Sequence, residues 1–173
     1  MSTRQCQVVQ VKTHSKASSP DLRQKILSAS VRLIEERGLA ALSMREVARQ
    51  AGVSHQAPYH YFRDRETILA TLVEAGFHAL AERLERVREG DPATERLFAR
   101  LAYAYVCFAL DEPGYFRLMF RPELVDLQRF PEAEQAGTRA LAILHGAIQT
   151  LGLPRRTEDV WLSYAWSLPH GLA

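Results

Sequence analysis

The segment LSMREVARQAGVSHQAPYHYF, at positions 42–62, is the most informative part of the sequence about the fold. Ser43 stands three residues before Glu46, which is the spacing of a capping box. In that arrangement the serine oxygen accepts a helix N–H, and the glutamate reaches back to a second one. Gly52 permits a sharp turn after this helix, because glycine adopts positive φ without steric cost. The stretch therefore predicts a helix, a tight turn and a second helix, which is the helix-turn-helix layout.

The same stretch carries the residues that two closely packed helices need. Ala48 is small where the helices must approach, and Val47 and Ala51 are apolar on the same helix. Ser54 can cap the second helix of the pair, which we expect to run through Tyr61. A helix placed in this way can project into a DNA major groove.

Outward from the motif, apolar residues recur at helical spacing and glycine or proline separates the segments. Helices are expected to start after Pro20, at Ser43, at Ser54, at Asp64, near residue 93, after Pro131 and near Thr157. No segment shows the alternating pattern of a strand. The predicted fold class is all-α.

Composition and length limit the possible classes of protein. The chain has 173 residues, 47% apolar and 24% charged, which suits one soluble domain or two small ones. Its two cysteines, Cys6 and Cys107, are too few for a disulfide scaffold and favour a cytoplasmic location. No apolar run reaches the length of about 18 residues that spans a membrane, so no membrane partner is expected. Residues 1–19 have little apolar pattern and are interpreted as a flexible arm.

Positive charge is concentrated in the first third of the chain. Through Arg65 there are eleven basic and five acidic residues, a net charge of +6. The remainder holds eleven basic and fifteen acidic residues, a net charge of −4. A basic end on an acidic body favours a polyanion partner, although a solvated surface can also be basic.

No pattern indicates catalysis or metal binding. The sequence has no nucleophile motif, no glycine-rich phosphate loop and no carboxylate pair, so we expect no enzyme activity. His78, His145 and His170 lack the spacing of metal ligands, so no metal or other cofactor is expected. Cys107 lies in an apolar segment, as an inert core thiol does.

Three segments together resemble the DNA-binding signature of the TetR-type transcriptional regulators. They are RQKILSASVRLIEERG at 23–38, LSMREVARQAGVS at 42–54 and YHYFRDRETIL at 59–69, in order and at the right spacing. The resemblance implies a three-helix DNA-binding domain over residues 20–66. It implies a helical ligand-binding and dimerisation domain over residues 67–173.

The second half resembles one subgroup of that family. DEPGYFRLMF at 111–120 and WSLPHGLA at 166–173 are similar to the subgroup whose ligand domain carries a Trp-His-Gly signature. Relatives usually continue beyond this point into a helix that completes a four-helix bundle between two subunits. Either this chain is cut short or its dimer uses less surface, and the sequence leaves both open.

The resemblance also implies which residues contact DNA. They are Ser43, Arg45, Ser54, His55, Gln56, Ala57, Tyr59, His60 and Arg65. Residues at the start of the recognition helix read base edges in the family, and the others reach backbone phosphates. Gln56 is the best candidate base reader, since its amide can pair bidentately with adenine N6 and N7. His55 could donate to guanine or only to phosphate, and for Ser43 a phosphate contact in addition to capping stays open.

The body of the chain is rich in aromatic residues, which most often form an ordinary core. The resemblance favours a partly open apolar pocket that binds a small apolar effector. The expected lining is Phe98, Leu101, Tyr105, Phe108, Phe116, Met119, Phe120, Leu144, His145 and Trp161. Tyr103 and Tyr105 are two residues apart, so they cannot both face inward on one helix.

A homodimer is expected through the last two long helices. Its apolar stripes would be Leu141, Leu144, Ile148, Trp161, Tyr164 and Leu168. The implied function is a regulator that binds a double-stranded DNA operator in a sequence-specific manner, a repressor by family habit. An effector would act by changing the separation of the two DNA-binding domains, since half-sites lie about 34–36 Å apart.

Overall fold

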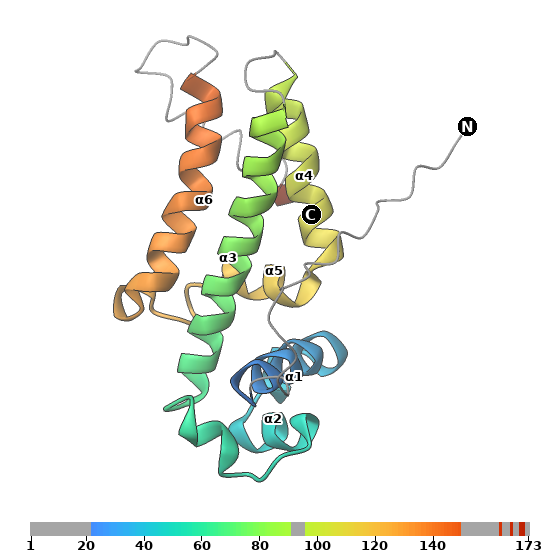
Figure 1. Ribbon diagram of the computed structural model, residues 1–173, viewed down its shortest axis with the longest axis vertical. Coiled ribbons are helices and arrows are strands. Elements are labelled where there is room, and N and C mark those ends of the chain that lie inside the picture. The colour runs from blue at the N-terminus through green and yellow to red at the C-terminus, as the bar shows by residue number, and fades with distance from the viewer. Residues whose placement is uncertain (1–21, 91–95, 150–162, 164–166, 168–169, 172–173) are drawn as a thin grey trace, which may run out of the picture. The chain divides into compact units, whose positions relative to one another are not determined.

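The computed structural model describes residues 22–90, 96–149, 163, 167, 170 and 171 of the chain (Figure 1). These residues contain six α-helices and three short 3-10 helices, and they contain no strand. They divide into two compact units, one up to Arg63 and one from Asp64 onward. We call them the N-terminal unit and the C-terminal unit. The prediction of an all-α fold is confirmed, whereas the arm and most of the helix expected near Thr157 lie outside the described residues.

The N-terminal unit begins with helix α1, Leu22–Arg37, which buries one face. The buried residues are Ile26, Leu27, Ala29, Ser30, Leu33 and Ile34. Ser30 is fully buried, and its hydroxyl donates to the carbonyl of Ile26 at 2.9 Å, which satisfies the polar group inside the core. A short 3-10 helix η1, Leu39–Ala41, leads from α1 to the helix-turn-helix motif.

Helix α2, Met44–Ala51, ends in the turn that the sequence predicts. Gly52 adopts the left-handed conformation, with φ +64° and ψ +41°. The turn is closed by a hydrogen bond of 3.0 Å from the backbone N–H of Val53 to the carbonyl of Ala48. Val47, Ala48 and Ala51 are buried, as expected for residues at the contact between packed helices.

The segment after the turn differs from the predicted helix through Tyr61. It forms a 3-10 helix, η2, over Ala57–His60. Backbone hydrogen bonds of the i to i+3 type begin at Ser54, whose carbonyl accepts from Ala57 at 3.0 Å. Pro58 has no N–H to donate, and the segment is too short to gain the cooperative bonds of a longer α-helix. The tighter 3-10 form is common in such short pieces.

The C-terminal unit is built around the long helix α3, Arg65–Gly90. Asp64 caps its start as predicted, because the Asp64 carboxylate accepts from the backbone N–H of Thr67 at 2.8 Å. Helix α3 lies between α4, Leu97–Asp111, and α6, Pro131–Gln149 (Figure 1). Helix α4 runs opposite to α3, whereas α6 runs in the same direction.

A short helix, α5, spans Pro113–Met119 and packs against α3. The break between α4 and α5 falls at Glu112, directly before Pro113 and Gly114. Glu112 has φ −126° and ψ +53°, outside the helical region, and Pro113 occupies the first turn of α5. Proline is well tolerated there, because the first N–H groups of a helix have no partner within the helix. A 3-10 helix η3, Leu127–Arg129, precedes α6.

Gly76 allows α5 to approach α3. A methyl group at Gly76 would lie 2.7 Å from the Met119 sulfur and 3.2 Å from Cβ of Tyr115. We therefore expect Gly76→Ala to lower the free energy of unfolding by about 1–3 kcal/mol, the usual cost of overpacking. The matched control is Gly146→Ala in α6, where an added methyl group meets nothing within 4 Å. That change should stabilise the chain by about 0.5–1 kcal/mol, because alanine favours the helix. Urea denaturation of both variants measures the difference, and equal effects would contradict the close approach.

Within the described residues, no helix combines the length and the apolar character needed to cross a membrane.

Candidate nucleic-acid interface

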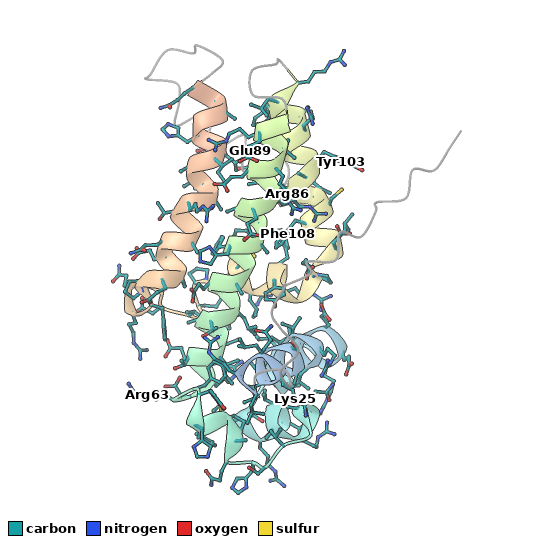
Figure 2. The ribbon with its side chains drawn as sticks, viewed as in Figure 1. Lys25, Arg63, Arg86, Glu89, Tyr103 and Phe108 are labelled. Carbon is teal, nitrogen blue, oxygen red and sulfur yellow. The ribbon has the colours of Figure 1, made fainter. Side chains whose placement is uncertain are left out.

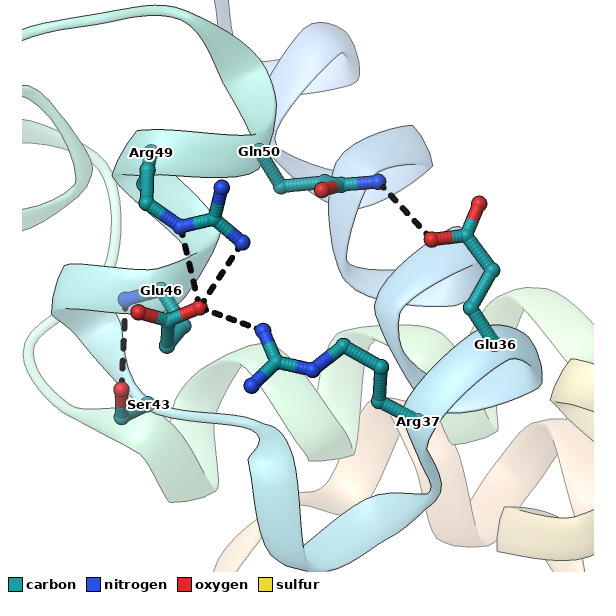
Figure 3. Close-up of polar contacts among 6 residues, drawn as sticks. All are labelled: Glu36, Arg37, Ser43, Glu46, Arg49 and Gln50. Atoms are coloured by element: carbon teal, nitrogen blue, oxygen red, sulfur yellow. Dashed lines mark hydrogen bonds and ion pairs between the residues drawn. The ribbon is translucent and has the colours of Figure 1, made fainter.

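The start of α2 carries a cluster of charged side chains around Glu46 (Figure 3). The Ser43 hydroxyl accepts from the backbone N–H of Glu46 at 3.2 Å, which is one half of the predicted capping box. The other half is not formed. The Glu46 carboxylate instead accepts from Nη1 of Arg37 at 2.7 Å and from Nε and Nη2 of Arg49 at 3.1 and 3.0 Å. Two guanidinium groups attract a carboxylate more strongly than a neutral backbone N–H does.

A second contact joins the same two helices. The Gln50 side chain donates from Nε2 to the Glu36 carboxylate at 3.3 Å (Figure 3). Arg37 and Glu36 belong to the end of α1, and Glu46 and Gln50 belong to α2. The two contacts therefore connect α1 with the first and last turns of α2 and help to set the angle between these helices.

The pKa of Glu46 is lowered from its usual value, first by the hydrogen bond from Arg49 and then by that from Arg37. A carboxyl group whose pKa is lower in the folded state stabilises the fold at pH values above its pKa in the unfolded chain. This stabilisation is lost as the pH falls through the pKa of the folded state. Glu46→Gln should therefore cause a small decrease in Tm at pH 7 that shrinks towards pH 3. Thermal unfolding against pH measures this. Glu89→Gln, an exposed change on α3, is the control, and a decrease that does not depend on pH would contradict the prediction.

The N-terminal unit has an excess of positive charge. Its described residues, 22–63, include seven basic and three acidic side chains, a net charge of +4. Arg37 and Arg49 share Glu46, but the exposed Arg45 makes no ion pair with any residue that the structure describes. Arg45 therefore presents its charge to solvent at the first turn of α2, as a phosphate-binding side chain requires.

Of the predicted base-reading residues, Ser54, His55 and Gln56 lie in the turn between α2 and η2, and Ala57 is the first residue of η2. Ser54, His55 and Gln56 are exposed, whereas Ala57 is buried and its side chain faces the core of the unit. The Gln56 amide nitrogen and Nε2 of His55 lie 3.0 Å apart. The two long polar side chains at this exposed turn are thus in contact with each other.

Aromatic and basic side chains continue this surface along η2. Tyr59 is 53% exposed, and His60 is also exposed. Tyr61 is 43% exposed and is an additional candidate beyond the predicted residues. The sequence feature that points to Tyr61 is the Tyr-His-Tyr triplet directly before the buried Phe62. Arg65, the remaining predicted residue, is half-buried in the first turn of α3 and belongs to the C-terminal unit.

Phe62 anchors the end of the motif. Its ring is 1% exposed, and the guanidinium carbon of Arg23 lies 5.4 Å from the ring centroid. This geometry is that of a cation–π contact. It joins the start of α1 to Phe62, two residues after the end of η2, so the two ends of the described part of the N-terminal unit are held together.

The predicted effector-binding residues belong to the C-terminal unit. Five are buried, namely Leu101, Tyr105, Phe108, Met119 and Leu144. Four are half-buried, namely Phe98, Phe116, Phe120 and His145. Trp161 lies outside the described residues. Tyr103 is 66% exposed and Tyr105 is 2% exposed, which confirms that the two cannot both face inward. In Figure 2 Tyr103 projects away from the helices, whereas Phe108 lies among them.

An aromatic cluster in this unit includes one polar pair. The Tyr105 hydroxyl lies 2.8 Å from Nδ1 of His170. The His170 ring packs against Phe120 and Phe116, with centroid distances of 4.8 and 5.5 Å. Burial raises the pKa of the Tyr105 hydroxyl far above its usual value, so the phenol is neutral at physiological pH.

The predicted dimer stripe on α6 is partly wrong. Leu144 and Ile148 are 3% and 1% exposed, so the single chain already buries them. Leu141 is 39% exposed and remains available for a contact. Leu141, Leu144 and Ile148 have the spacing of a single stripe along one side of a helix. Helix α6, however, packs against both α3 and α4, and these two helices cover more of its surface than one such stripe. Trp161, Tyr164 and Leu168 lie outside the described residues.

The part of the chain that the structure describes contains no group of three or more His, Cys, Asp or Glu residues arranged to hold a metal ion. Cys107 is buried in α4 and is not part of a disulfide within the described residues.

A helix-turn-helix unit followed by a helical unit defines a class of protein, the DNA-binding transcription regulators with a helical ligand-binding domain. Residues 26–72 match the bacterial regulatory proteins of the tetR family, and residues 98–173 match the tetracyclin repressor-like C-terminal domain. The chain belongs to the TetR family. Regulators of this family bind DNA operators and act as dimers.

Solved structures agree with this assignment. A protein of unknown function from Rhodococcus sp. RHA1 has 31% sequence identity and a TM-score of 0.71, over 92% of this chain and 83% of that one. A bacterial regulatory protein in the tetR family from Rhodococcus RHA1 has 18% identity and a TM-score of 0.71, over 87% and 82%. A TetR-family transcriptional regulator from Bordetella parapertussis 12822 has 18% identity and a TM-score of 0.66, over 86% and 84%. The last two share the fold of this chain.

Proposed function

We propose that the chain is a cytoplasmic, homodimeric repressor that binds a specific double-stranded DNA operator and is released by a small apolar effector. The DNA-binding domain would comprise residues 20–66, and the ligand-binding and dimerisation domain residues 67–173. The observation that carries the proposal is the exposed turn with His55 and Gln56, which follows α2 in a unit of net positive charge. Long polar side chains read base edges, and basic side chains bind the flanking phosphates.

Roles within the interface follow from exposure and chemistry. Ser43, Arg45, Tyr59, His60 and Arg65 would contact phosphates and set the register of the protein on the duplex. The exposed Gln56 would read bases, with Ser54 and His55 beside it. The buried Ala57 would shape the turn rather than touch DNA.

The aromatic cluster around Tyr105 and His170 supports an effector site in the C-terminal unit. Apolar rings with a few polar groups are typical of pockets for small organic ligands. Phe116 and Phe120 supply the apolar surface, while the hydroxyl and imidazole pair can orient a ligand. We place the chain in the subgroup with the Trp-His-Gly signature on this basis, since His170 of that motif takes part in the cluster.

DNA selection tests the proposal. Incubating the purified chain with a random duplex library should enrich one sequence with two-fold symmetry, because a dimer presents two identical domains. Affinity for the enriched operator should exceed affinity for random DNA by about 10³ or more. Gln56→Ala should reduce the operator affinity by about 1–3 kcal/mol and leave random DNA unaffected. Failure to enrich any sequence would contradict sequence-specific binding.

Ligand titration tests regulation. A panel of apolar compounds should contain some that change tryptophan fluorescence, since both tryptophans, Trp161 and Trp166, fall in the proposed ligand-binding domain. An effector must also weaken operator binding, and the operator must weaken effector binding by the same factor. A compound that binds tightly without changing DNA affinity would show a pocket that is not coupled to repression.

A further inference from the structure

The contact between His55 and Gln56 joins two side chains of the proposed base-reading turn. Both are exposed, and their Nε2 atoms lie 3.0 Å apart. The backbone beneath them is held independently, because the Ser54 carbonyl accepts from Ala57 at 3.0 Å and the Gln56 carbonyl accepts from Tyr59 at 3.1 Å. The backbone is therefore ordered by η2, whereas the orientation of the Gln56 amide depends on its side-chain partner.

The chemistry of the two nitrogens defines the direction of this hydrogen bond. An amide nitrogen donates and does not accept, so the imidazole of His55 accepts at Nε2 and carries its proton on Nδ1. The Gln56 amide has two N–H groups and one carbonyl oxygen. One N–H is used by His55, which leaves the second N–H and the oxygen.

The remaining N–H and the carbonyl oxygen match the hydrogen-bonding groups of adenine. In the major groove adenine presents N7 as an acceptor and the N6 amino group as a donor. The free N–H of Gln56 can donate to N7, and its oxygen can accept from N6. Both pairings are compatible with a hydrogen bond to His55 through the N–H that points away from the amide oxygen.

We propose that His55 is a positioning residue that holds the Gln56 amide with its adenine-reading edge directed outward, and so sets the base preference of the recognition turn. This role rests on the proposed DNA-binding function. A free glutamine side chain loses rotamer freedom when it binds a base, and a partner that orders it beforehand reduces that loss. This ordering increases affinity only at a site where Gln56 makes its bidentate contact with adenine. It therefore increases the preference for that base and not the affinity for DNA in general.

The test begins with the operator selected by the wild-type chain. The base pair read by Gln56 is the one whose preference disappears in Gln56→Ala. At that position, His55→Ala should lower the preference for adenine about twofold to tenfold, the range expected for ordering one long side chain. Its affinity for random DNA should stay unchanged. His55→Gln should recover part of the preference, because its amide oxygen can accept the same N–H.

Two controls separate positioning from other roles. His60→Ala changes an exposed histidine of η2 and should affect the operator and random DNA alike. Replacing the contacted adenine with 7-deazaadenine removes the N7 acceptor, so the difference in affinity between the wild type and His55→Ala should shrink. Equal Tm values for the variants would show that folding is unaffected.

The outcomes are distinguishable. If the wild type selects no sequence, the proposed function fails and the role of His55 fails with it. If the wild type selects an operator but His55→Ala retains the full adenine preference, only the positioning role is overturned. The same holds if His55→Ala weakens operator and random DNA by one common factor, or if no base pair depends on Gln56.

Discussion

DNA binding should weaken by about three orders of magnitude when the salt concentration rises from about 50 to about 200 mM, if a dimer contacts about six phosphates. The physical reason is counterion release: each phosphate that a basic side chain neutralises frees a cation, and added salt opposes this. The described residues of the N-terminal unit carry a net charge of +4, and Arg45 makes no ion pair within the described part of the chain. Their charge is therefore available for phosphates.

Fluorescence anisotropy with labelled operator and random duplexes over a series of salt concentrations measures this effect. The slope of log K against log salt should be steep for both duplexes. Arg45→Gln should reduce the slope by about 1 for each phosphate that Arg45 contacts. Arg88→Gln, an exposed change near the end of α3, is the control and should leave the slope unaltered. A flat salt response on both duplexes would rule out phosphate binding by this unit.

Truncation of Phe62 should have the largest effect on stability. Phe62→Ala is expected to lower the free energy of unfolding of the N-terminal unit by about 3–5 kcal/mol, the range for a buried phenylalanine. The ring is 1% exposed, and its loss also removes the cation–π contact with the Arg23 guanidinium. A unit this small has little stability in reserve, so we expect the unit to unfold in part and DNA binding to be lost.

Hydrogen exchange resolves this effect by region. Amides of α1 and α2 should lose protection in Phe62→Ala, whereas amides of α3 and α6 should keep theirs. Tyr61→Ala is the control, because it removes an adjacent aromatic ring that is 43% exposed and should change stability by no more than about 0.5 kcal/mol. A comparable loss of protection in both variants would show that Phe62 is not the specific anchor of the motif.

Several parts of the fold could be predicted because their causes are local. Gly52 ends α2 in the left-handed conformation, and Asp64 caps α3 through the N–H of Thr67. Each of these features depends on residues within one helical turn, so the order of amino acids is sufficient to indicate it. The separation of Tyr103 and Tyr105 onto opposite sides of α4 follows from helical geometry in the same way.

Other features could not be predicted, because they depend on which segments meet. The Glu46 carboxylate accepts from Arg37 of α1 instead of completing the capping box, and nothing in the spacing of Ser43 and Glu46 indicates an arginine from another helix. The candidate DNA-binding site also has features that could not be predicted from the sequence. Its residues were selected from a resemblance, but the burial of Ala57 and the contact between His55 and Gln56 are visible only once the turn has its shape.

The order of amino acids alone is enough to establish that the chain is helical, where its helix-turn-helix motif lies and that basic residues are concentrated around that motif. Capping, periodicity and charge act over short distances along the chain, so they can be recognised without coordinates. The burial of Leu144 and Ile148 within one chain, in contrast, follows only from how the helices pack. Burial depends on every helix that packs against a residue, and α6 meets both α3 and α4 at positions distant in sequence.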